Sequence, residues 1–429
     1  MKRYSIFIIC ALLIAFASCI KEDKLLTIDE HARDALYKIM NENYLWYDLM
    51  PKVKKEYYAD PYELLEAMRY RELDRWSFIM DYDEFIQQNN AIFVGHGIRL
   101  GLAEDNTVRI AQVYEKSQLY EYGVRRGWII KRLNAFELAP IFINNDVAFY
   151  NILMGPSEAG VTNQFLFETP EGKDSVIIAT KSIFTANTVI HCDTLHLKTG
   201  ITGHLVFEQF VSPSNAELET AFAFFRRNNI NNIIVDLRYN GGGSISVLQN
   251  LAAHIAGPSK FGQPFLTLTY NDLQKTSNEI IKFGSVNSSI NVEKMIVITT
   301  RGTASASEDF INGLKPFIDI TTVGDVTNGK PVGMEVFRYE KEYVFAPITF
   351  TLVNTDNEGD FYGGFSPAKY APDDITRDWN DRNEACLNEA IYILENGSVS
   401  PTRSEYNSGK PVILYDELKK PNGAYLIYK

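Results

Sequence analysis

The chain has 429 residues, of which 45% are hydrophobic and 22% are charged, and its formal net charge is −12. At roughly 150 residues per domain this length suggests about three domains, and the globular composition excludes a disordered chain, a collagen and a coiled-coil rod. The acidic balance argues against a dedicated nucleic-acid binder, because phosphate contacts need a basic face. After residue 20 no stretch approaches the roughly 20 apolar residues of a spanning helix, which excludes a polytopic membrane protein.

Residues 1–18 are predicted to be a signal peptide. Lys2 and Arg3 form a short cationic start, residues 6–16 form an apolar run, and small residues lead directly to Cys19. Small residues ahead of a cysteine resemble the lipobox of bacterial lipoproteins, in which the cysteine is lipidated and becomes the new N-terminus. The resemblance implies that Cys19 attaches the chain to a membrane of the cell envelope. The alternative is an ordinary signal peptide with a cysteine there by chance.

The residues after Cys19 bear on where the chain is displayed. The run Lys21, Glu22 and Asp23 resembles the surface-export signal of Bacteroidetes lipoproteins, and a plain polar tether is an equal alternative. The expected location is therefore the outer membrane, with the chain facing either the periplasm or the exterior.

The four cysteines do not form a disulfide framework. Cys10 leaves with the signal peptide and Cys19 is the predicted anchor, so only Cys192 and Cys386 remain. Their spacing does not decide whether they pair.

Residues 19–92 are predicted to form a tether followed by a small helical domain. Apolar residues recur at three- and four-residue steps over residues 28–50, and Pro51 ends the run. Residues 62–68 and 82–88 suggest further short helices. The segment carries no recognisable chemistry.

Residues 93–183 are predicted to form a β domain, because short apolar runs alternate with turn residues. Strands are expected at residues 93–100, 108–113, 127–134, 165–169 and 176–180. A short helix at 117–122 lies between two of them, and a turn at 170–172 makes a hairpin of the last two.

The order of these elements resembles a PDZ domain. In that family a glycine-bearing loop directs backbone N–H groups at the terminal carboxylate of a peptide, and the peptide adds a strand to a sheet edge. The resemblance assigns peptide binding to Gly95, Gly97 and Ile98. Trp128 departs from the pattern, since such domains often carry an acidic residue after the glycine that Gly127 matches. An unrelated small β domain is the alternative.

Residues 184–395 alternate strands and helices, as a layered α/β core does. Buried strands are expected at 205–207, 233–235 and 295–300, and amphipathic helices at 214–225, 245–256 and 306–315. Ser214 and Glu217 stand three residues apart and predict a capping box. Residues 396–429 form a tail rich in Pro, Ser, Asn and Gly.

The first junction that could carry chemistry is the run Asp-Leu-Arg-Tyr-Asn-Gly-Gly-Gly-Ser at residues 236–244. Its three glycines leave backbone N–H groups unshielded, so the loop can bind an anion such as a phosphate, a carboxylate or the oxyanion of an acyl transfer. The run lacks the Gly-Lys-Ser/Thr ending of a P-loop and the glycine spacing of a dinucleotide site. A flexible turn without a function is the alternative.

The second junction is the run Thr-Ala-Ser-Ala-Ser-Glu at residues 303–308. A serine at a helix N-terminus usually caps the helix. The same position also suits a nucleophile, because the helix dipole favours developing negative charge and the next backbone N–H can join an oxyanion hole. A nucleophilic Ser305 needs a base to accept its proton.

Three separated features resemble the C-terminal processing peptidases, also named tail-specific proteases: the Thr-Ala-Ser-Ala-Ser-Glu run, Lys330 at 25 residues beyond Ser305 (305 to 330), and the upstream triple-glycine loop. The resemblance implies a crotonase-like β-β-α core behind a PDZ-like domain. It makes Ser305 the nucleophile and Lys330 the base of a Ser–Lys dyad, with oxyanion donors at the N–H groups of Gly242 and Ala306. Glu308 matches the acidic position in that family's helix, where it assists catalysis or only favours the helix start.

The chemistry constrains Lys330. A free lysine has a pKa near ~10.4 and cannot accept a proton at neutral pH, whereas burial can lower the pKa by about 3–5 units. Lys330 must therefore lie in a largely apolar pocket; a solvated loop lysine is the alternative. Several processing peptidases carry a glutamine four residues after the lysine, and Met334 stands there instead, which puts the orientation of the amine in doubt.

The sequence thus predicts a multi-domain α/β protein that is a secreted, lipid-anchored serine endopeptidase acting on polypeptides, with no cofactor, no metal and no nucleic-acid partner. The run of His191, Cys192 and His196 lacks the second half of a zinc site. The main alternative is a non-catalytic surface lipoprotein that binds peptide or glycan on the same fold. A nucleotide-binding glycine loop is a third, less favoured hypothesis.

Overall fold

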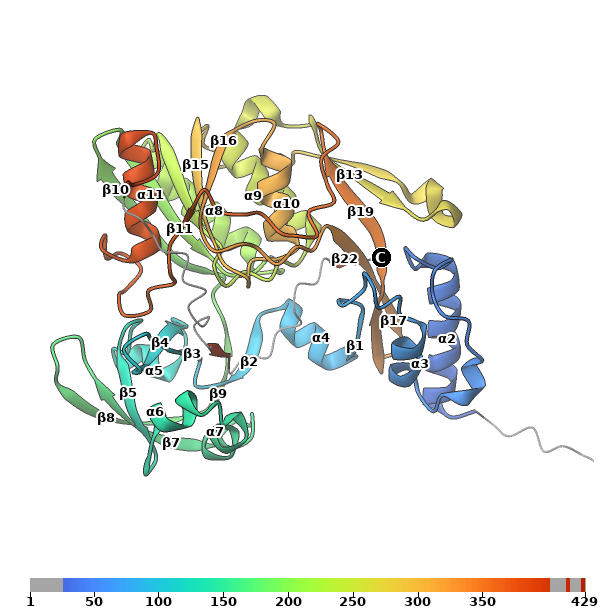
Figure 1. The fold of residues 1–429 in the computed structure, drawn as a ribbon, viewed down its shortest axis with the longest axis horizontal. Helices are drawn as coiled ribbons and strands as arrows, with labels where there is room; N and C mark the ends of the chain where they lie inside the picture. Colours follow the sequence, from blue (N-terminus) through green and yellow to red (C-terminus); the bar gives the residue numbers. More distant parts are fainter. Residues whose placement is uncertain (1–25, 402–413, 417–425, 429) are drawn as a thin grey trace, which may run out of the picture.

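The computed structural model describes residues 26–401, 414–416 and 426–428. The predicted signal peptide, the lipidation site Cys19 and the run at 21–23 lie outside the described residues, as does most of the tail from residue 402. Figure 1 shows a layered core at the top, a smaller sheet domain below it, and the first helices of the chain on one side.

A six-stranded sheet forms the centre of the core. Its strands lie in the order β10 (Val189–Leu197), β11 (Gly200–Phe207), β12 (Asn232–Asp236), β15 (Lys294–Thr299), β16 (Asp319–Gly324) and β20 (Lys369–Tyr370). From β11 onward the strands run parallel, while β10 pairs antiparallel with β11. Because parallel strands end at the same edge, the segments after β12 and β15 are brought together.

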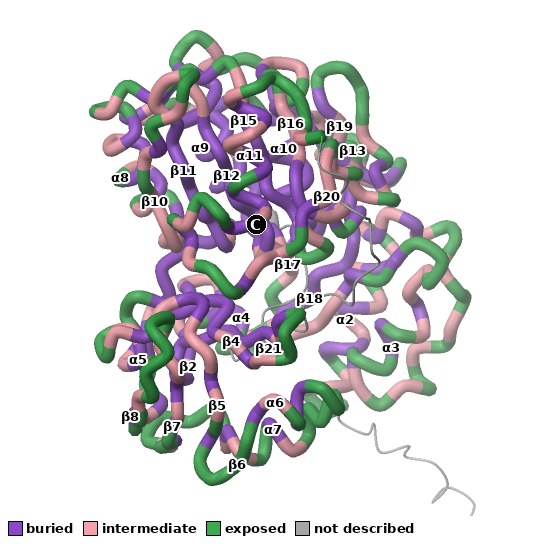
Figure 2. Tube along the Cα trace, turned by 60° about the vertical axis from the view of Figure 1, so that its left-hand side comes forward, coloured by how far each residue is buried: buried purple, intermediate pink, exposed green. Residues whose placement is uncertain are grey.

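Helices cover both faces of this sheet, as the continuous apolar run of β12 requires. Ile233 and Val235 pack in the larger core with α8 (Ser214–Arg227), α9 (Ile245–Ala256) and α10 (Ala306–Leu314). Ile234 faces the other way and packs with α11 (Ala385–Asn396). Figure 2 shows the buried residues concentrated in these central strands and in α9 and α10.

A second sheet stands beside the first. Its strands lie in the order β1 (Phe78–Asp81), β18 (Tyr343–Ala346), β17 (Val332–Tyr339), β19 (Ile348–Asn354), β13 (Pro264–Tyr270) and β14 (Glu279–Lys282). The N-terminal helices α2 (Ile28–Asn43) and α3 (Pro61–Met68) share a hydrophobic core with β17 and β18, and α4 (Tyr82–Asn89) follows β1. The first helices of the chain therefore pack on a strand that begins two residues after Lys330.

The third sheet belongs to the domain below the core in Figure 1. Its main path is β21 (Leu414–Asp416), β3 (Ile98–Leu102), β4 (Val108–Val113), β5 (Ile129–Leu133), β7 (Thr162–Glu168) and β8 (Asp174–Thr180). Three helices cover it: α5 (Gln118–Glu121), α6 (Leu138–Ile143) and α7 (Val147–Met154). A separate pair, β2 (Ile92–Gly95) with β9 (Ser182–Thr185), joins the two ends of the domain.

Several predicted elements are confirmed, among them the hairpin of β7 and β8, strand β4 and helix α9. The predicted helix at 28–50 is wrong in its length, because α2 ends at Asn43. Tyr44 is fully buried and Trp46 nearly so, but both lie in the turn that follows the helix. Their burial continues the apolar periodicity past the point where the helix stops. Helices α6 and α7 were not predicted.

The predicted capping box of α8 is also wrong. Pro213 precedes the helix, and the Ser214 hydroxyl donates to the Gln209 carbonyl at 2.8 Å and accepts from the Val211 N–H at 3.1 Å. The Glu217 carboxylate instead accepts the Val189 N–H at 2.8 Å. The two side chains therefore fix neighbouring chain segments rather than each other.

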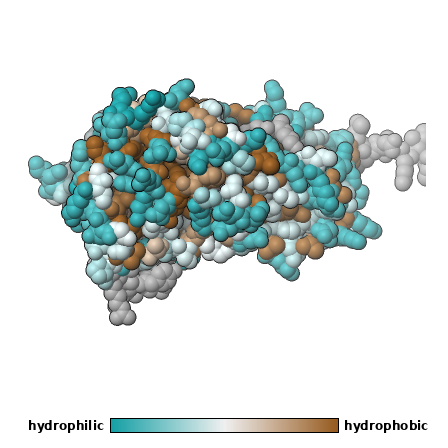
Figure 3. All heavy atoms as spheres, turned by 90° about the horizontal axis from the view of Figure 1, so that it is seen from above, coloured by the Kyte–Doolittle hydropathy of each residue, from teal (hydrophilic) through white to brown (hydrophobic). Residues whose placement is uncertain are grey.

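Cys192 and Cys386 are free thiols, so they are not paired with each other. In the described part of the chain, no helix is long and apolar enough to cross a membrane. Seen from above, the surface is mixed, with small hydrophobic areas between hydrophilic side chains (Figure 3).

Candidate active site

The loops after β12 and β15 meet at Gly242. Its backbone has φ +102°, and a Cβ at this position would lie 2.7 Å from Ser305 Cβ and 2.9 Å from the Ala304 carbonyl oxygen. Only glycine permits this approach, because a side chain would collide with the backbone opposite. The structure thus brings together three residues that the sequence singled out, since the same Cβ would lie 3.0 Å from the Ala306 nitrogen.

Asn240 holds the two loops together. Its carbonyl oxygen accepts from the Ala304 N–H at 3.1 Å and from the Ser307 hydroxyl at 3.0 Å. Its side-chain oxygen accepts from the Gly242 N–H at 2.9 Å, and its side-chain nitrogen donates to the Phe207 carbonyl at 3.0 Å. A role for Asn240 is not predicted from the sequence, because an asparagine before glycines is an ordinary turn residue.

Ser305 is held in an unusual conformation directly before α10. Its φ of 63° and ψ of −125° are costly for a residue with a side chain. Its hydroxyl is buried and has no hydrogen-bond partner within the described residues. Because leaving a buried hydroxyl unsatisfied is costly, both features point to a function at this oxygen rather than to fold stability.

Glu308 ties Ser305 to the loop that carries Lys330. One carboxylate oxygen accepts from the Thr327 hydroxyl at 2.6 Å and from the Gly329 N–H at 2.7 Å. The other accepts from the N–H groups of Ser305 and Lys330, both at 2.9 Å. Burial raises the pKa of Glu308, and these hydrogen bonds oppose the rise. The carboxylate therefore positions the backbone on both sides of the site.

Lys330 is fully buried. Burial lowers the pKa of its amine to about 7, against the opposing charges of Asp74, Glu308 and Asp309. The amine donates to the Met334 sulfur at 3.7 Å, and a thioether is a weak, uncharged acceptor. The alternative of a solvated loop lysine is therefore excluded, and a neutral amine is available near neutral pH.

Two further acidic residues act electrostatically on Lys330 and were not found from the sequence. Asp309 on α10 is fully buried, and burial raises its pKa well above the usual range. Asp74 comes from the N-terminal segment, where its carboxylate accepts from the Tyr44 hydroxyl at 2.8 Å and from the Ser77 hydroxyl at 2.6 Å. Both act on the charge of Lys330 through tertiary proximity, which no local pattern reveals.

Ser305 and Lys330 are not in hydrogen-bond contact with each other, since the serine hydroxyl has no partner in the described chain. Catalytic hydrogen bonds are often long or open before substrate binds, so this geometry does not argue against a dyad. The Gly242 N–H is likewise engaged, by Asn240. Among the described residues the Ser305 hydroxyl is thus unpaired, whereas the Gly242 N–H is already bound within its own loop.

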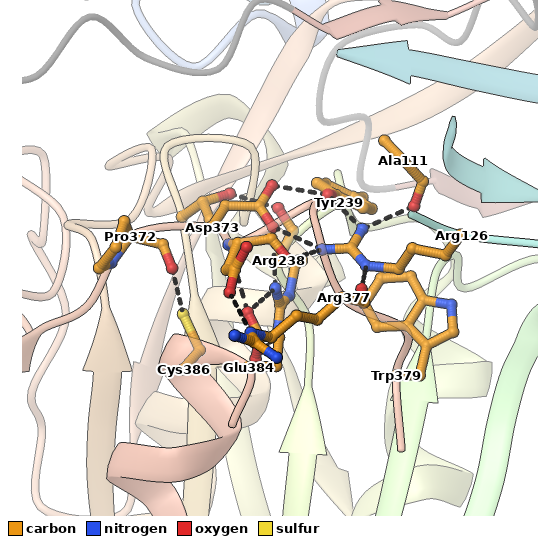
Figure 4. Close-up of polar contacts among 12 residues, drawn as sticks. Ala111, Arg126, Arg238, Tyr239, Pro372, Asp373, Arg377, Trp379, Glu384 and Cys386 are labelled. Atoms are coloured by element: carbon orange, nitrogen blue, oxygen red, sulfur yellow. Dashed lines mark hydrogen bonds and ion pairs between the residues drawn. The ribbon is translucent and has the colours of Figure 1, made fainter. Parts of the chain in front are cut away.

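A buried network of charges anchors the start of the glycine loop (Figure 4). The Arg238 guanidinium contacts the carboxylates of Asp236 at 2.7 Å, Asp373 at 2.8 Å and Glu384 at 2.8 Å. Arg126 reaches the same Asp373 at 2.9 Å from the smaller domain. We refer to these five residues as the arginine network; it fixes the backbone that leads into the triple glycine.

The predicted peptide-binding residues lie apart from this site, at the start of β3. Gly95 ends β2, and Gly97 turns the chain with φ +71°, where a Cβ would lie 2.5 Å from Ser117 Cβ. Ile98 is buried and opens β3. The outer edge of β3 is paired with β21, from the C-terminal end of the chain.

Within the described residues, no group of three or more His, Cys, Asp or Glu side chains is arranged to hold a metal ion. The free thiol of Cys192 neighbours His191, and burial raises the pKa of this thiol to about 12. Burial thus disfavours the thiolate form, which is the form that binds a metal.

Comparisons with known proteins find matches to one peptidase family. Residues 201–367 match peptidase family S41, a family of serine peptidases, and residues 32–78 match the N-terminal domain of S41 peptidases. The first match contains Gly242, Ser305, Glu308 and Lys330, and the second contains Asp74.

Two curated relatives that the chain matches are named as proteases. The carboxy-terminal processing protease CtpB of Bacillus subtilis is 21% identical over 260 residues, which cover 60% of this chain and 51% of that protein. A protein of Staphylococcus epidermidis named as a CtpA-like serine protease is 27% identical over 146 residues, which cover 33% of this chain and 28% of that protein. The chain thus matches about half or less of the length of these relatives.

The fold has a solved counterpart. The crystal structure of a candidate S41 protease from Bacteroides fragilis is similar with a TM-score of 0.68 at 22% identity, and covers 84% of this chain and 96% of that chain. The mixed α/β, multi-domain fold is therefore similar to the fold of that protein.

Proposed function

We propose, from the premise that residues 201–367 are the peptidase domain of family S41, that this chain is a serine endopeptidase cleaving polypeptides with a Ser305–Lys330 dyad. The observation that carries the proposal is a buried hydroxyl without a partner, in a strained turn that the Glu308 carboxylate links to a buried lysine whose pKa lies near 7. Structural roles do not require either feature.

The reaction runs through an acyl-enzyme. Ser305 Oγ attacks the carbonyl carbon of the peptide while the neutral Lys330 amine takes its proton, so a C–O bond forms and the carbonyl oxygen becomes an oxyanion. The tetrahedral intermediate collapses when the ammonium returns that proton to the leaving nitrogen. Water then attacks the ester carbon while the Lys330 amine takes one of its protons. The C–Oγ bond breaks as the ammonium returns that proton to Ser305 Oγ, and the acid product is released.

The oxyanion is stabilised by backbone N–H groups. Ala306 is the first residue of α10, where an N–H has no carbonyl within the helix and points out along the helix dipole. The second donor is Gly242, whose N–H becomes available when the Asn240 side chain turns away. Asn240 is thus a candidate switch between the resting and the active arrangement of the loop.

The remaining assignments extend the same proposal. The core is a crotonase-like β-β-α unit, and the 93–183 domain is PDZ-like and presents a polypeptide to the site through the turn at Gly95, Gly97 and Ile98. A lipid on Cys19 holds the secreted chain on the outer membrane. The small-residue run before Cys19 and the position of the turn at the head of β3 support these assignments.

Hydrolysis of an unfolded protein substrate tests the dyad. Ser305→Ala and Lys330→Ala are each expected to lose at least about a thousandfold in kcat/KM. Ser259→Ala and Lys275→Ala, at exposed positions of the core, are matched controls and should keep full activity. Undiminished cleavage by either dyad variant would refute the proposed mechanism.

A fluorophosphonate probe tests the nucleophile separately. Such a probe reacts with an activated serine whatever the natural substrate is. Labelling that disappears in Ser305→Ala supports the enzyme, and no labelling of the parent chain supports the non-catalytic binding protein instead.

A further inference from the structure

The edge of β3 carries a strand from the far end of the same chain. β21 pairs antiparallel with β3, with Leu414 opposite Gly101, Tyr415 opposite Leu100 and Asp416 opposite Arg99. β3 is the strand that begins directly after the turn at Gly97. An open sheet edge is a site at which an extended peptide can add a strand through main-chain hydrogen bonds.

A pocket beside this edge holds one aromatic side chain. Tyr415 is 8% exposed, and its ring centroid lies 4.1 Å from that of Phe142 and 5.3 Å from that of Tyr150. Its hydroxyl donates to the Asn145 side-chain oxygen at 3.1 Å. An apolar wall with one polar group at its end fits a tyrosine, which has an apolar ring and a polar tip.

The pocket is built by the two helices that extend this domain. Phe142 lies on α6, Tyr150 lies on α7, and Asn145 lies in the connection between them with φ 53°. The side chains that recognise Tyr415 therefore come from one short helical hairpin facing β3. Affinity would come from the strand pairing and selectivity from this pocket.

The same C-terminal segment also reaches the candidate active site. β22 (Leu426–Tyr428) pairs in parallel with β17, with Leu426 opposite Met334 and Tyr428 opposite Val336. Met334 is the residue whose sulfur accepts from the Lys330 amine. One segment of the chain thus supplies an added strand both at the β3 edge and at the strand that follows Lys330.

We propose that the β3 edge and the pocket of Phe142, Tyr150 and Asn145 form a binding site for an extended polypeptide with an aromatic residue, and that residues 414–416 occupy this site as a built-in competitor. The proposal rests on the proposed function in one respect: the polypeptide that replaces residues 414–416 is the substrate of the peptidase. The binding itself does not depend on Ser305.

The pairing of β21 with β3 is short enough for another peptide to replace β21. β21 has three residues, whereas β7 and β8 pair over seven residues each in the same sheet. A tethered segment is nevertheless an effective competitor, since its effective concentration near the site is of millimolar order. A peptide added in solution must therefore compete with residues 414–416. A substitution that weakens the binding of these residues to the β3 edge should make the site accessible to the added peptide.

The test measures binding of a fluorescent peptide with the sequence of residues 411–418 to the mature full-length chain carrying Ser305→Ala. Adding Tyr415→Ala to the protein should tighten binding at least about tenfold, because the competitor loses its anchor. Tyr415→Phe should change binding less than about threefold, because the ring still fills the pocket. Tyr122→Ala removes an exposed tyrosine of the same domain and serves as the control.

The peptide itself provides the reciprocal test. The same peptide with alanine in place of tyrosine should not bind to the Tyr415→Ala protein. Hydrogen exchange should show faster exchange of the amides of residues 99–101 in the Tyr415→Ala protein, with β7 and β8 still protected, which confirms that the domain is folded. Unchanged peptide affinity in a folded Tyr415→Ala protein would overturn the proposal.

This result is separable from the peptidase assignment. All binding measurements are made with Ser305→Ala, so they do not depend on hydrolysis. Competitive binding without any hydrolysis by the parent chain would refute the Ser–Lys mechanism alone. Hydrolysis by the parent chain, without competition between the added peptide and residues 414–416, would refute only the claim that these residues are a built-in competitor.

Discussion

The arginine network and the Lys330 pocket are both buried sites for a basic side chain, but they set its charge in opposite ways. Arg238 is 2% exposed and Lys330 is 0% exposed. Burial alone would lower both pKa values, yet the charges of Asp236 and Glu384 raise the pKa of Arg238 well above its usual range. The pKa of Lys330 instead falls to about 7.

The difference lies in what the nearby carboxylates do. In the arginine network they contact the guanidinium directly, at 2.7 to 2.8 Å. Near Lys330, the Glu308 carboxylate accepts four hydrogen bonds, and the one from Lys330 comes from its backbone N–H. Burial also raises the pKa values of Glu308 and Asp309. The pKa of Lys330 is therefore lowered by burial while the Glu308 carboxylate is engaged by other groups, whereas direct carboxylate contacts reverse the effect of burial at Arg238.

The largest expected effect comes from replacing the neutral base itself. Lys330→Met removes the proton acceptor while keeping a chain of similar size, so hydrolysis should fall at least about a thousandfold. The variant should nevertheless be more stable than the parent. The pKa shift from 10.5 to about 7 corresponds to a folding penalty of about 4 kcal/mol near pH 7. Urea unfolding measures the gain.

The pH dependence of that gain checks its cause. The folded pKa lies below the unfolded one, so the unfolded chain binds the proton more tightly and folding is penalised by the full amount below about pH 7. The penalty shrinks by about 1.4 kcal/mol per unit as the pH rises toward 10.5. A Lys330→Met protein that is less stable than the parent at every pH would contradict the comparison.

The opposite outcome is expected in the arginine network. Arg238→Met removes the cation but leaves three carboxylates buried, so the free energy of unfolding should fall by about 3–5 kcal/mol. Arg301→Met is the matched control, because its side chain is 62% exposed and its ion pair with Asp325 should contribute at most about 1 kcal/mol. Equal losses in the two variants would show that direct contact is not what distinguishes the buried site.

A smaller effect is expected when Glu308 is changed to Gln. The amide keeps the size but loses the charge and turns an NH₂ group toward donors, so some of the four hydrogen bonds are lost and the Ser305 and Lys330 backbones separate. The expected loss is about 10- to 100-fold in kcat with KM nearly unchanged. Glu279→Gln, at an exposed position of β14, is the control for side-chain chemistry alone. A change confined to KM would assign Glu308 to substrate binding instead.

The sequence predicted those parts of the site that a local pattern carries. Ser305 and Gly242 lie in two strand-to-helix junctions that were read from the residues, and the resemblance to the C-terminal processing peptidases added Lys330. The structure brings their segments together. Asn240, Asp74 and Asp309 were missed, because their roles depend on neighbours that are distant in sequence.

The fold shows the same limit. Alternating apolar residues predicted the β7–β8 hairpin, whose partners are close in sequence. The pattern of apolar residues did not predict that α2 would end at Asn43 while Tyr44 stays buried, because Tyr44 is buried by packing against the second sheet. Pairing of β21 with β3 joins residues more than 300 positions apart, from 101 to 414, and no local sequence pattern predicts this pairing.

The smallest expected effect concerns how closely the pKa of Lys330 is tuned. Since the neutral amine is the reactive form, kcat/KM should rise tenfold per unit below about pH 7 and level off above it. Met334→Gln replaces the weak thioether acceptor with an amide oxygen, which favours the ammonium and should move this plateau upward by less than about one unit. Met334→Leu removes the acceptor and should move it slightly downward. Shifts of opposite sign in the two variants would show that the side chain at position 334 helps to set the pKa of the Lys330 amine, as the carboxylates do for Arg238. If kcat/KM levelled off only near pH 10 in all three proteins, Lys330 would be solvated during turnover.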